Sequence, residues 1–313
     1  MRVVFLDRDS LPVRFNTPKC ATSYQAYGHT SAAEVVERLT GAAVAILNKV
    51  PLQASALAHL PTLKLVSITA TGFDCVDIAA CRARGIAVTH VKDYATVSVP
   101  EHVFMLILAL RRNLKGYERL MQQGAWPKAT QFCVLDGSIQ DLHGATLGLI
   151  GYGSLGQAVA ALGRAFGMRV IYYSPSRVGL SPDCVSLDTV FADSDIVSLH
   201  CPLNAHTHHL INAARLAQMR RTSLLINTAR GALIDEAALH AALVNGVIQG
   251  AGLDVLGQEP PPAQHALLAL NLPNLLITPH IAWASQRAME QLADGASANV
   301  DAWALGKHQA RVV

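Results

Sequence analysis

Three ionisable residues, Arg230, Glu259 and His280, come just after apolar runs in the segments "LLINTAR", "GLDVLGQE" and "LLITPH". If these runs are parallel strands of one sheet, their carboxyl ends meet at one edge, where open α/β sheets bind ligands. An arginine there can hold an anionic group by paired hydrogen bonds, and a histidine can transfer a proton. A glutamate can orient the histidine and favour its charged form. The three residues together predict an acid–base site for a small anion.

Each of these residues also has a structural interpretation. A single histidine at a strand end is more often structural than catalytic, and Arg230 could cap a helix. Glu259 stands before three prolines, where a solvated turn is an ordinary explanation. The case for catalysis therefore rests on the combination and not on any one residue.

A glycine-rich segment, "LGLIGYGSLGQAVA", joins an apolar run to an alanine-rich helical pattern. Gly151, Gly153 and Gly156 have the spacing G-x-G-x-x-G, in which the glycines allow a tight turn, a close approach of backbone to a pyrophosphate, and tight helix–strand packing. The helix N-terminus then faces the anion. In this context the segment, with Ser154 and Leu155, predicts a dinucleotide site, and an ordinary glycine turn is the alternative.

The residues after the next apolar run bear on the choice of dinucleotide. NAD-selective sites carry an acidic residue about 20 positions beyond the glycine loop, where it binds the ribose hydroxyls. Here "RVIYY" is followed by Ser174 and Arg177, and no carboxylate appears before Asp183. A serine and an arginine suit a 2′-phosphate, so NADP(H) is favoured over NAD(H). If Arg177 is only solvated, NAD(H) or both cofactors remain open.

The segments that must position these residues alternate between apolar runs and helical patterns. Buried runs joined by helices are typical of parallel strands with right-handed crossovers. Strands are predicted at 3–6, 43–47, 63–70 and 86–90, and again at 145–150, 168–173, 195–202, 222–229, 248–255 and 274–280. The second set supplies the six strands of a dinucleotide-binding sheet. The sequence therefore predicts an α/β protein with two doubly wound parallel-sheet domains.

Two intervening segments differ from this alternation. Residues 96–123 predict one long helix that is apolar almost all round, with Pro100 in its first turn. The loop that follows contains Trp126 and Phe132, and bulky side chains in such a loop often bury themselves in a partner. The last helix is predicted at about 283–306.

Composition excludes several classes of protein. The chain has 313 residues, of which 51% are hydrophobic and 15% charged, with a net charge of +3. These values fit a globular enzyme and exclude a disordered chain, and no basic run indicates nucleic acid or a membrane surface. No signal peptide or spanning segment is evident, and the scattered cysteines suggest reduced thiols, so a soluble cytoplasmic protein is expected. The histidines at 206, 208 and 209 lack further ligands, so no metal is expected.

These motifs together resemble the D-isomer-specific 2-hydroxyacid dehydrogenases. The resemblance is carried in order by "ITATGFDCVDI", "VPEHV", "LGLIGYGSLGQAVA", "DIVSLHCPLNAHTHHLIN", "LLINTARGALIDEAAL", "GAGLDVLGQEPP" and "NLLITPHIAWAS", over nearly the whole chain. The "HIAWAS" ending is most similar to the glycerate dehydrogenases, also called hydroxypyruvate reductases. The resemblance implies a Rossmann cofactor domain, 98–285, inserted into a flavodoxin-like substrate domain, 1–97 and 286–313. It also implies a homodimer formed through the cofactor domain and the loop near Trp126.

The resemblance implies a role for each matching residue. Arg230 would bind the substrate carboxylate and carbonyl, His280 would donate or accept the proton, and Glu259 would keep the imidazole charged near neutral pH. Backbone amides around Thr71 and Gly72 would bind the carboxylate, whereas Asn48 and Lys49 could be either a substrate contact or a turn. The remaining residues would contact the cofactor: Cys201, Pro202 and Thr207 along the adenosine and phosphates, and Thr228, Ala229 and Asp254 near the nicotinamide.

The expected reaction is reduction of hydroxypyruvate, and also of glyoxylate, to the D-2-hydroxyacid. Pyruvate or a larger 2-ketoacid is an alternative, because one methylene changes discrimination by only about 1–3 kcal/mol. A dinucleotide-sensing protein without catalysis is a second alternative, although it would not need all three catalytic positions. A formate dehydrogenase is disfavoured, since that enzyme typically has glutamine where Glu259 stands. A phosphite dehydrogenase is disfavoured by the overall motif pattern.

Overall fold

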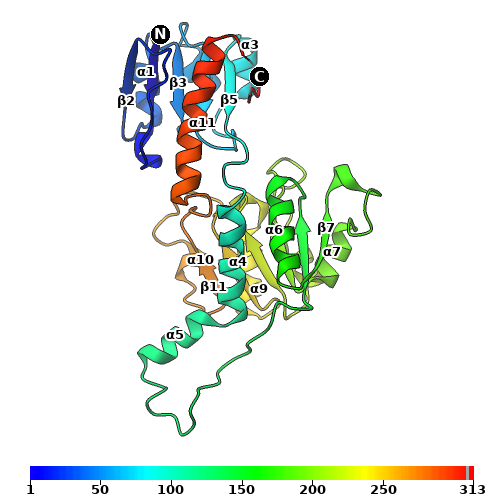
Figure 1. The fold of residues 1–313 in the computed structure, drawn as a ribbon. Coiled ribbons are helices and arrows are strands. Elements are labelled where there is room, and N and C mark those ends of the chain that lie inside the picture. Colours follow the sequence, from blue (N-terminus) through cyan, green and yellow to red (C-terminus); the bar gives the residue numbers. More distant parts are fainter. Residues whose placement is uncertain (308–309) are drawn as a thin grey trace. The chain divides into compact units, whose positions relative to one another are not determined.

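The apolar runs of the sequence form two parallel β-sheets in the computed structural model, which describes residues 1–307 and 310–313. Each sheet belongs to its own compact unit. Unit 1 consists of residues 1–94 and 284–313, and unit 2 of residues 95–283 (Figure 1). No helix of the described residues is long and apolar enough to span a membrane.

Unit 1 has the strand order β2-β1-β3-β4-β5, which is the doubly wound order of flavodoxin-like folds. Strands β3, β4 and β5 are buried along their whole length, as continuous apolar runs predict. Edge strand β2 is mostly exposed and has no such run, so the sequence did not reveal it. The strands are β1 (Arg2–Phe5), β2 (Ser23–Ala26), β3 (Val44–Leu47), β4 (Leu65–Ile68) and β5 (Ala87–His90).

Helices and the C-terminal residues complete unit 1. The crossovers contain α1 (Val35–Leu39), α2 (Ala54–Leu57) and α3 (Ile78–Ala83), and α11 (Gln286–Ala304) packs against β4 and β5 (Figure 1). The Ser67 hydroxyl donates to the Ala296 carbonyl, and the Asn299 amide donates to the His90 carbonyl. Beyond α11, the backbone amide of Val312 donates to Val88. The unit therefore contains both ends of the chain.

Unit 2 has the strand order β11-β10-β9-β8-β6-β7. A single parallel bridge between Tyr172 and Cys184 lies beyond β7, where a further strand would stand. With that bridge counted as a residual strand, the order is that of a Rossmann sheet. The strands are β6 (Thr146–Ile150), β7 (Arg169–Tyr173), β8 (Ile196–Leu199), β9 (Leu224–Asn227), β10 (Gly250–Leu253) and β11 (Leu275–Ile277). All six predicted strands of this sheet are confirmed.

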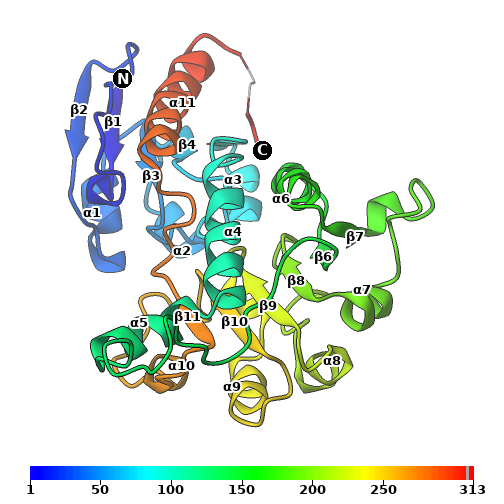
Figure 2. The same ribbon diagram turned by 60° about the horizontal axis from the view of Figure 1, so that its bottom comes forward.

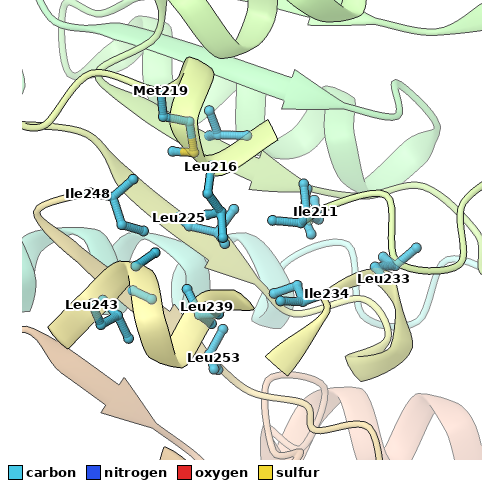
Figure 3. Close-up of a cluster of buried hydrophobic side chains, with 14 of the residues drawn as sticks. Ile211, Leu216, Met219, Leu225, Leu233, Ile234, Leu239, Leu243, Ile248 and Leu253 are labelled. Atoms are coloured by element: carbon cyan, nitrogen blue, oxygen red, sulfur yellow. The ribbon is translucent and has the colours of Figure 1, made fainter. Parts of the chain in front are cut away.

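Helices cover both faces of the sheet of unit 2. Figure 2 shows α4 (Ser98–Arg111) and α6 (Ser154–Ala165) on one face, with α7 (Leu187–Asp193), α8 (Ala213–Gln218) and α9 (Glu236–Val244) on the other. The short helix α10 (Ala266–Ala269) precedes β11. Between α8, α9 and the sheet lies a core of aliphatic side chains that includes Leu216, Leu225, Leu239 and Leu253 (Figure 3). Burying each such side chain stabilises the folded state by about 2 kcal/mol. This core therefore helps to hold the strands of unit 2, and the residues that follow them, in fixed positions.

The prediction of one long helix over 96–123 was wrong. The chain forms α4 and then α5 (Leu114–Gln122), separated by Asn113 in the left-handed conformation with φ of 51°. Asparagine tolerates this conformation better than most residues. The Asn113 side chain also donates to the Asp136 carbonyl, which fixes the break. Helical periodicity continues across the break, so the pattern alone did not reveal it.

Residues 124–141, which we call the arm, follow α5 without forming a helix or strand and extend from the sheet of unit 2 (Figure 1). Its large apolar side chains are exposed: Phe132 by 89%, Leu135 by 81% and Trp126 by 56%. The Trp126 indole donates to the Phe132 carbonyl, and the Asp136 amide donates to the Tyr117 hydroxyl. Hydrogen bonds within the arm and to α5 therefore hold the arm in place, although its large apolar side chains are not buried by other residues of the described chain.

Candidate active site

The three candidate catalytic residues follow three neighbouring strands. Arg230 comes after β9, Glu259 after β10 and His280 after β11, and these strands are adjacent in the order β11-β10-β9. The strands are parallel, so all three residues lie at the carboxyl edge of the sheet of unit 2. This is the edge at which open α/β sheets bind ligands.

His280 and Glu259 form a direct pair. Nδ1 of His280 lies 2.6 Å from Oε2 of Glu259, and the other carboxylate oxygen, Oε1, accepts a bond of 2.9 Å from the Leu256 amide. The side chains are 25% and 35% exposed, so the pair is partly shielded from water. Because Nδ1 faces the carboxylate, Nε2 is the nitrogen that can exchange a proton with a substrate.

Asp254 holds the backbone that carries His280. His280 has φ of 57°, a conformation that costs energy for a residue other than glycine. Its amide donates to the Asp254 carbonyl, while the Asp254 carboxylate accepts bonds from the amides of Ile281 and Ala282 at 2.9 and 2.8 Å. Asp254 is only 1% exposed. The buried carboxylate thus stabilises the unusual conformation through several hydrogen bonds.

A second pair, Glu236 and His265, is partly buried and holds the loop that carries Glu259. Oε1 of Glu236 accepts a bond of 2.8 Å from the Gly257 amide, and Oε2 lies 3.0 Å from Nε2 of His265. Sequence analysis did not identify Glu236 or His265. The signal available in the sequence was weak, since neither residue follows a strand of the sheet.

The loop of Arg230 packs against the loop of Glu259. A Cβ atom on Gly231 would lie 1.9 Å from the Leu256 carbonyl carbon, so only glycine fits there. The Asn227 side chain donates to the Arg230 carbonyl and accepts from the Ala229 amide, which shapes the turn after β9. The Arg230 guanidinium donates to the Ala229 carbonyl at 2.7 Å.

The glycine loop has the shape that a dinucleotide requires. Gly151 has φ of +99°, and a Cβ there would lie 2.5 Å from the His200 backbone. A Cβ on Gly156 would lie 2.4 Å from the Gly151 carbonyl oxygen, whereas one on Gly153 would meet no atom of the described chain within 4 Å. Gly153 is the N-cap of α6, and Ser154 and Leu155 begin the helix. The open backbone at a helix N-terminus fits a pyrophosphate.

The structure places the residues of the predicted adenosine side after β7 and β8. Ser174 is buried at the end of β7, and its hydroxyl lies 3.3 Å from that of Ser176. The Arg177 guanidinium stands 5.5 Å from the centre of the Tyr152 ring. Cys201 and Pro202 follow β8, and the Thr207 hydroxyl donates to the Pro202 carbonyl at 2.7 Å. Burial raises the pKa of the Cys201 thiol to about 11.

The residues of the predicted nicotinamide side follow the neighbouring strands β9 and β10. Thr228 and Ala229 follow β9, and the Thr228 hydroxyl is buried without a hydrogen-bond partner among the described residues. Asp254 follows β10. The predicted cofactor residues thus stand at the carboxyl ends of five strands of one sheet, β6 to β10.

The remaining predicted substrate residues, Thr71 and Gly72, belong to unit 1 and follow β4. The Thr71 hydroxyl donates to the Val91 carbonyl, and the Thr71 carbonyl lies 2.7 Å from Nδ1 of His90. In the same unit the buried Asp7 carboxylate accepts bonds from the amides of Asn48 and Lys49. Burial, partly opposed by these bonds, raises the pKa of Asp7. These hydrogen bonds from Asn48 and Lys49 to Asp7 stabilise the turn without any contact to a substrate.

Residues 104–282 match the family model "D-isomer specific 2-hydroxyacid dehydrogenase, NAD binding domain". The chain is also 47% identical to the glycerate dehydrogenase of Methylorubrum extorquens over 98% of both chains. The chain belongs to the D-isomer-specific 2-hydroxyacid dehydrogenase family. Members of this family are dinucleotide-dependent oxidoreductases, so the glycine loop and the contact between His280 and Glu259 belong to an enzyme.

Other members of the family are similar over most of the chain. The hydroxypyruvate reductase of Blautia hydrogenotrophica is 32% identical, over 88% of this chain and 87% of the relative. The crystal structure of the D-lactate dehydrogenase of Aquifex aeolicus, complexed with NAD and lactic acid, superposes with a TM-score of 0.83. It is 32% identical and covers 97% of this chain, and the match covers 96% of that chain. The two-sheet fold is therefore the fold of this dehydrogenase family.

Proposed function

We propose that this D-2-hydroxyacid dehydrogenase reduces hydroxypyruvate, and also glyoxylate, to the corresponding D-2-hydroxyacid. The observation that carries the proposal is the contact of 2.6 Å between His280 Nδ1 and Glu259 Oε2 at the carboxyl edge of the sheet. A histidine held by a carboxylate is suited to general acid–base catalysis, and Arg230 on the neighbouring strand is suited to a carboxylate substrate.

Each catalytic residue has one role in the proposed reaction. The bound dinucleotide supplies the hydride that reduces the keto carbon. Arg230 binds the carboxylate and the carbonyl oxygen, and the amides of Thr71 and Gly72 are the proposed further contacts of the carboxylate. Nε2 of protonated His280 gives its proton to the carbonyl oxygen, while Glu259 stabilises the imidazolium. In oxidation, neutral His280 takes the hydroxyl proton back.

The names of similar proteins support hydroxypyruvate as substrate. One relative is a glycerate dehydrogenase and another a hydroxypyruvate reductase. Pyruvate remains the alternative, because the similar structure from Aquifex aeolicus is a D-lactate dehydrogenase. Hydroxypyruvate is favoured since the glycerate dehydrogenase is similar over almost the full length of both chains at 47% identity.

We propose that NADP(H) is preferred over NAD(H). Ser174, Ser176 and Arg177 stand at the end of β7, where an acidic residue would bind free ribose hydroxyls. The contact of Arg177 with the Tyr152 ring holds the guanidinium beside the glycine loop. Two hydroxyls and a guanidinium can bind a 2′-phosphate by charge-assisted hydrogen bonds.

Initial rates of reduction test both proposals. Wild type is compared with His280→Ala and with His59→Ala, a surface control in unit 1. Hydroxypyruvate, glyoxylate and pyruvate are each assayed with NADPH and NADH. We expect turnover of hydroxypyruvate with NADPH, a loss of at least about 100-fold in His280→Ala, and no change in the control.

Two results would contradict these proposals. Turnover that is faster with NADH than with NADPH would overturn the cofactor preference and leave the reaction unaffected. Folded protein that binds dinucleotide but reduces none of the three ketoacids would overturn the proposed reaction and favour a sensing role.

A further inference from the structure

His102 on helix α4 contacts Thr278 and Asp254, which lie next to His280 in the candidate site. Its side chain is 13% exposed, and Nε2 lies 2.9 Å from Oγ1 of Thr278 and 3.5 Å from Oδ1 of Asp254. Thr278 in turn donates its hydroxyl proton to Oδ1 of Asp254 at 2.6 Å. These contacts link α4, which crosses one face of the sheet, to the segment that follows β11.

The Asp254 carboxylate organises the whole segment from Thr278 to Ala282. It accepts bonds from the Thr278 hydroxyl and from the amides of Ile281 and Ala282. The segment also contains His280, whose positive φ must be maintained by its surroundings. Asp254 binds both the Thr278 hydroxyl and the backbone next to His280. The orientation of that hydroxyl therefore affects the direction in which the His280 side chain leaves the backbone.

Hydrogen-bond geometry gives His102 a definite role in this network. Thr278 uses its single proton on Asp254, so its oxygen must accept from Nε2 of His102. Burial lowers the pKa of His102, and the charge of Asp254 only partly opposes this effect. A neutral His102 with the proton on Nε2 donates to Thr278 and adds no charge beside Asp254. The chain of donors then runs from His102 through Thr278 to Asp254.

We propose that His102 is a positioning residue for the proton transfer: through Thr278 and Asp254 it fixes the backbone of His280 and keeps the imidazole on Glu259. His102 acts through these residues and is not a catalytic residue itself. The inference rests on the proposed function, because it assigns His280 the proton transfer. Misplacement of a reacting group by about 1 Å can cost as much as 100-fold in rate.

The test compares variants that break the network with one that breaks only packing. His102→Ala and Thr278→Val remove the link, and His102→Gln retains a donor of similar reach. Leu106→Ala is the matched control, because Leu106 lies one turn further along α4, is 1% exposed and packs against Gly252 of β10 without a polar link. For each variant, kcat, KM, the Kd for NADPH and NADH, the pH profile and the melting temperature are measured.

We expect His102→Ala and Thr278→Val to lower kcat about tenfold or more and to move the pH profile of reduction to lower pH. KM for the ketoacid and Kd for the dinucleotide should change less than about twofold, and His102→Gln should recover most of kcat. The double variant should be no slower than either single variant, because both break one network. Leu106→Ala should lose stability with kcat and pH profile unchanged.

A second readout does not depend on turnover. The Trp283 indole donates to the His280 carbonyl at 2.9 Å, so its N–H resonance in an NMR spectrum reports the position of this segment. The resonance is assigned with Trp283→Phe. It should shift in His102→Ala and Thr278→Val and stay in place in Leu106→Ala. If wild type reduces none of the ketoacids but the resonance still shifts, the proposed function fails while the positional link stands.

The proposal is overturned if His102→Ala behaves like Leu106→Ala, with lower stability but unchanged kcat, pH profile and indole resonance. It is equally overturned if His102→Gln is as slow as His102→Ala while the Trp283 resonance stays in place in both, since His102 would then act without positioning the segment.

Discussion

Glu259→Gln keeps the shape of the side chain and removes its charge. The amide can still bond to His280 and to the Leu256 amide, but it no longer favours the imidazolium. We expect kcat for reduction to fall by about 10- to 100-fold, and the pH at which half of the activity is lost to move lower. Glu290→Gln, in the unit that lacks the pair, is the control. An unchanged pH profile would show that the charge of Glu259 is not used.

We expect His200, whose backbone lies beside the glycine loop, to make the free energy of unfolding depend on pH. Burial lowers the pKa of His200 from 6.5 to about 4, so between these values the unfolded chain binds a proton that the folded chain does not. The contribution of His200 to the free energy of unfolding is complete above pH 6.5 and is lost as the pH falls from 6.5 to about 4. The free energy of unfolding should fall by up to about 1.4 kcal/mol per pH unit across this window. The free energy of unfolding of His200→Asn, measured by urea unfolding at several pH values, should change less with pH than that of wild type. An equal dependence on pH would contradict this role of His200.

At the scale of elements, Asn113 separates α4 from α5 in a left-handed conformation. Asn113→Ala places a less tolerant residue there and removes the bond to the Asp136 carbonyl. It should lower the free energy of unfolding by about 1–2 kcal/mol. Asn113→Gly loses the same bond but relieves the backbone, so it should cost less. Thermal unfolding of both variants distinguishes them, and equal losses would mean that the backbone conformation is not the cause.

The sequence predicted the elements that bury continuous apolar runs. The central strands of both sheets and the helices between them were found, because burial on both faces produces a clear pattern. Strand β2 was missed because its mostly exposed residues form no apolar run. The break at Asn113 was missed because a single left-handed residue leaves the helical period unchanged on either side.

The same contrast holds within the candidate site. Arg230, Glu259 and His280 could be named as candidates because they stand just after strands, and the structure shows Nδ1 of His280 in contact with the Glu259 carboxylate. His102 and Glu236 could not be named as candidates in that way, since their contacts depend on how distant segments fold together. No spacing rule in the sequence connects residue 102 with residue 278.

At the scale of the whole molecule, the arm predicts self-association. Phe132 and Leu135 are 89% and 81% exposed, and such side chains commonly become buried against a partner. We propose a homodimer in which a second copy covers the arm. Phe132→Ser combined with Leu135→Ser should convert the dimer to a monomer in light scattering, while Val178→Ser, at another exposed apolar residue, should not. A wild-type monomer at micromolar concentration would contradict this proposal.

The division of the chain also sets an order of events during protein synthesis. Unit 2 is one continuous stretch, so all of its strands are available once residue 283 has left the ribosome. Unit 1 must wait, because α11 and the residues that bond to Val88 are made after unit 2. A nascent chain stalled before α11 would therefore contain a complete cofactor-binding sheet joined to an unfinished one, whose uncovered face is the part that chaperones would need to protect.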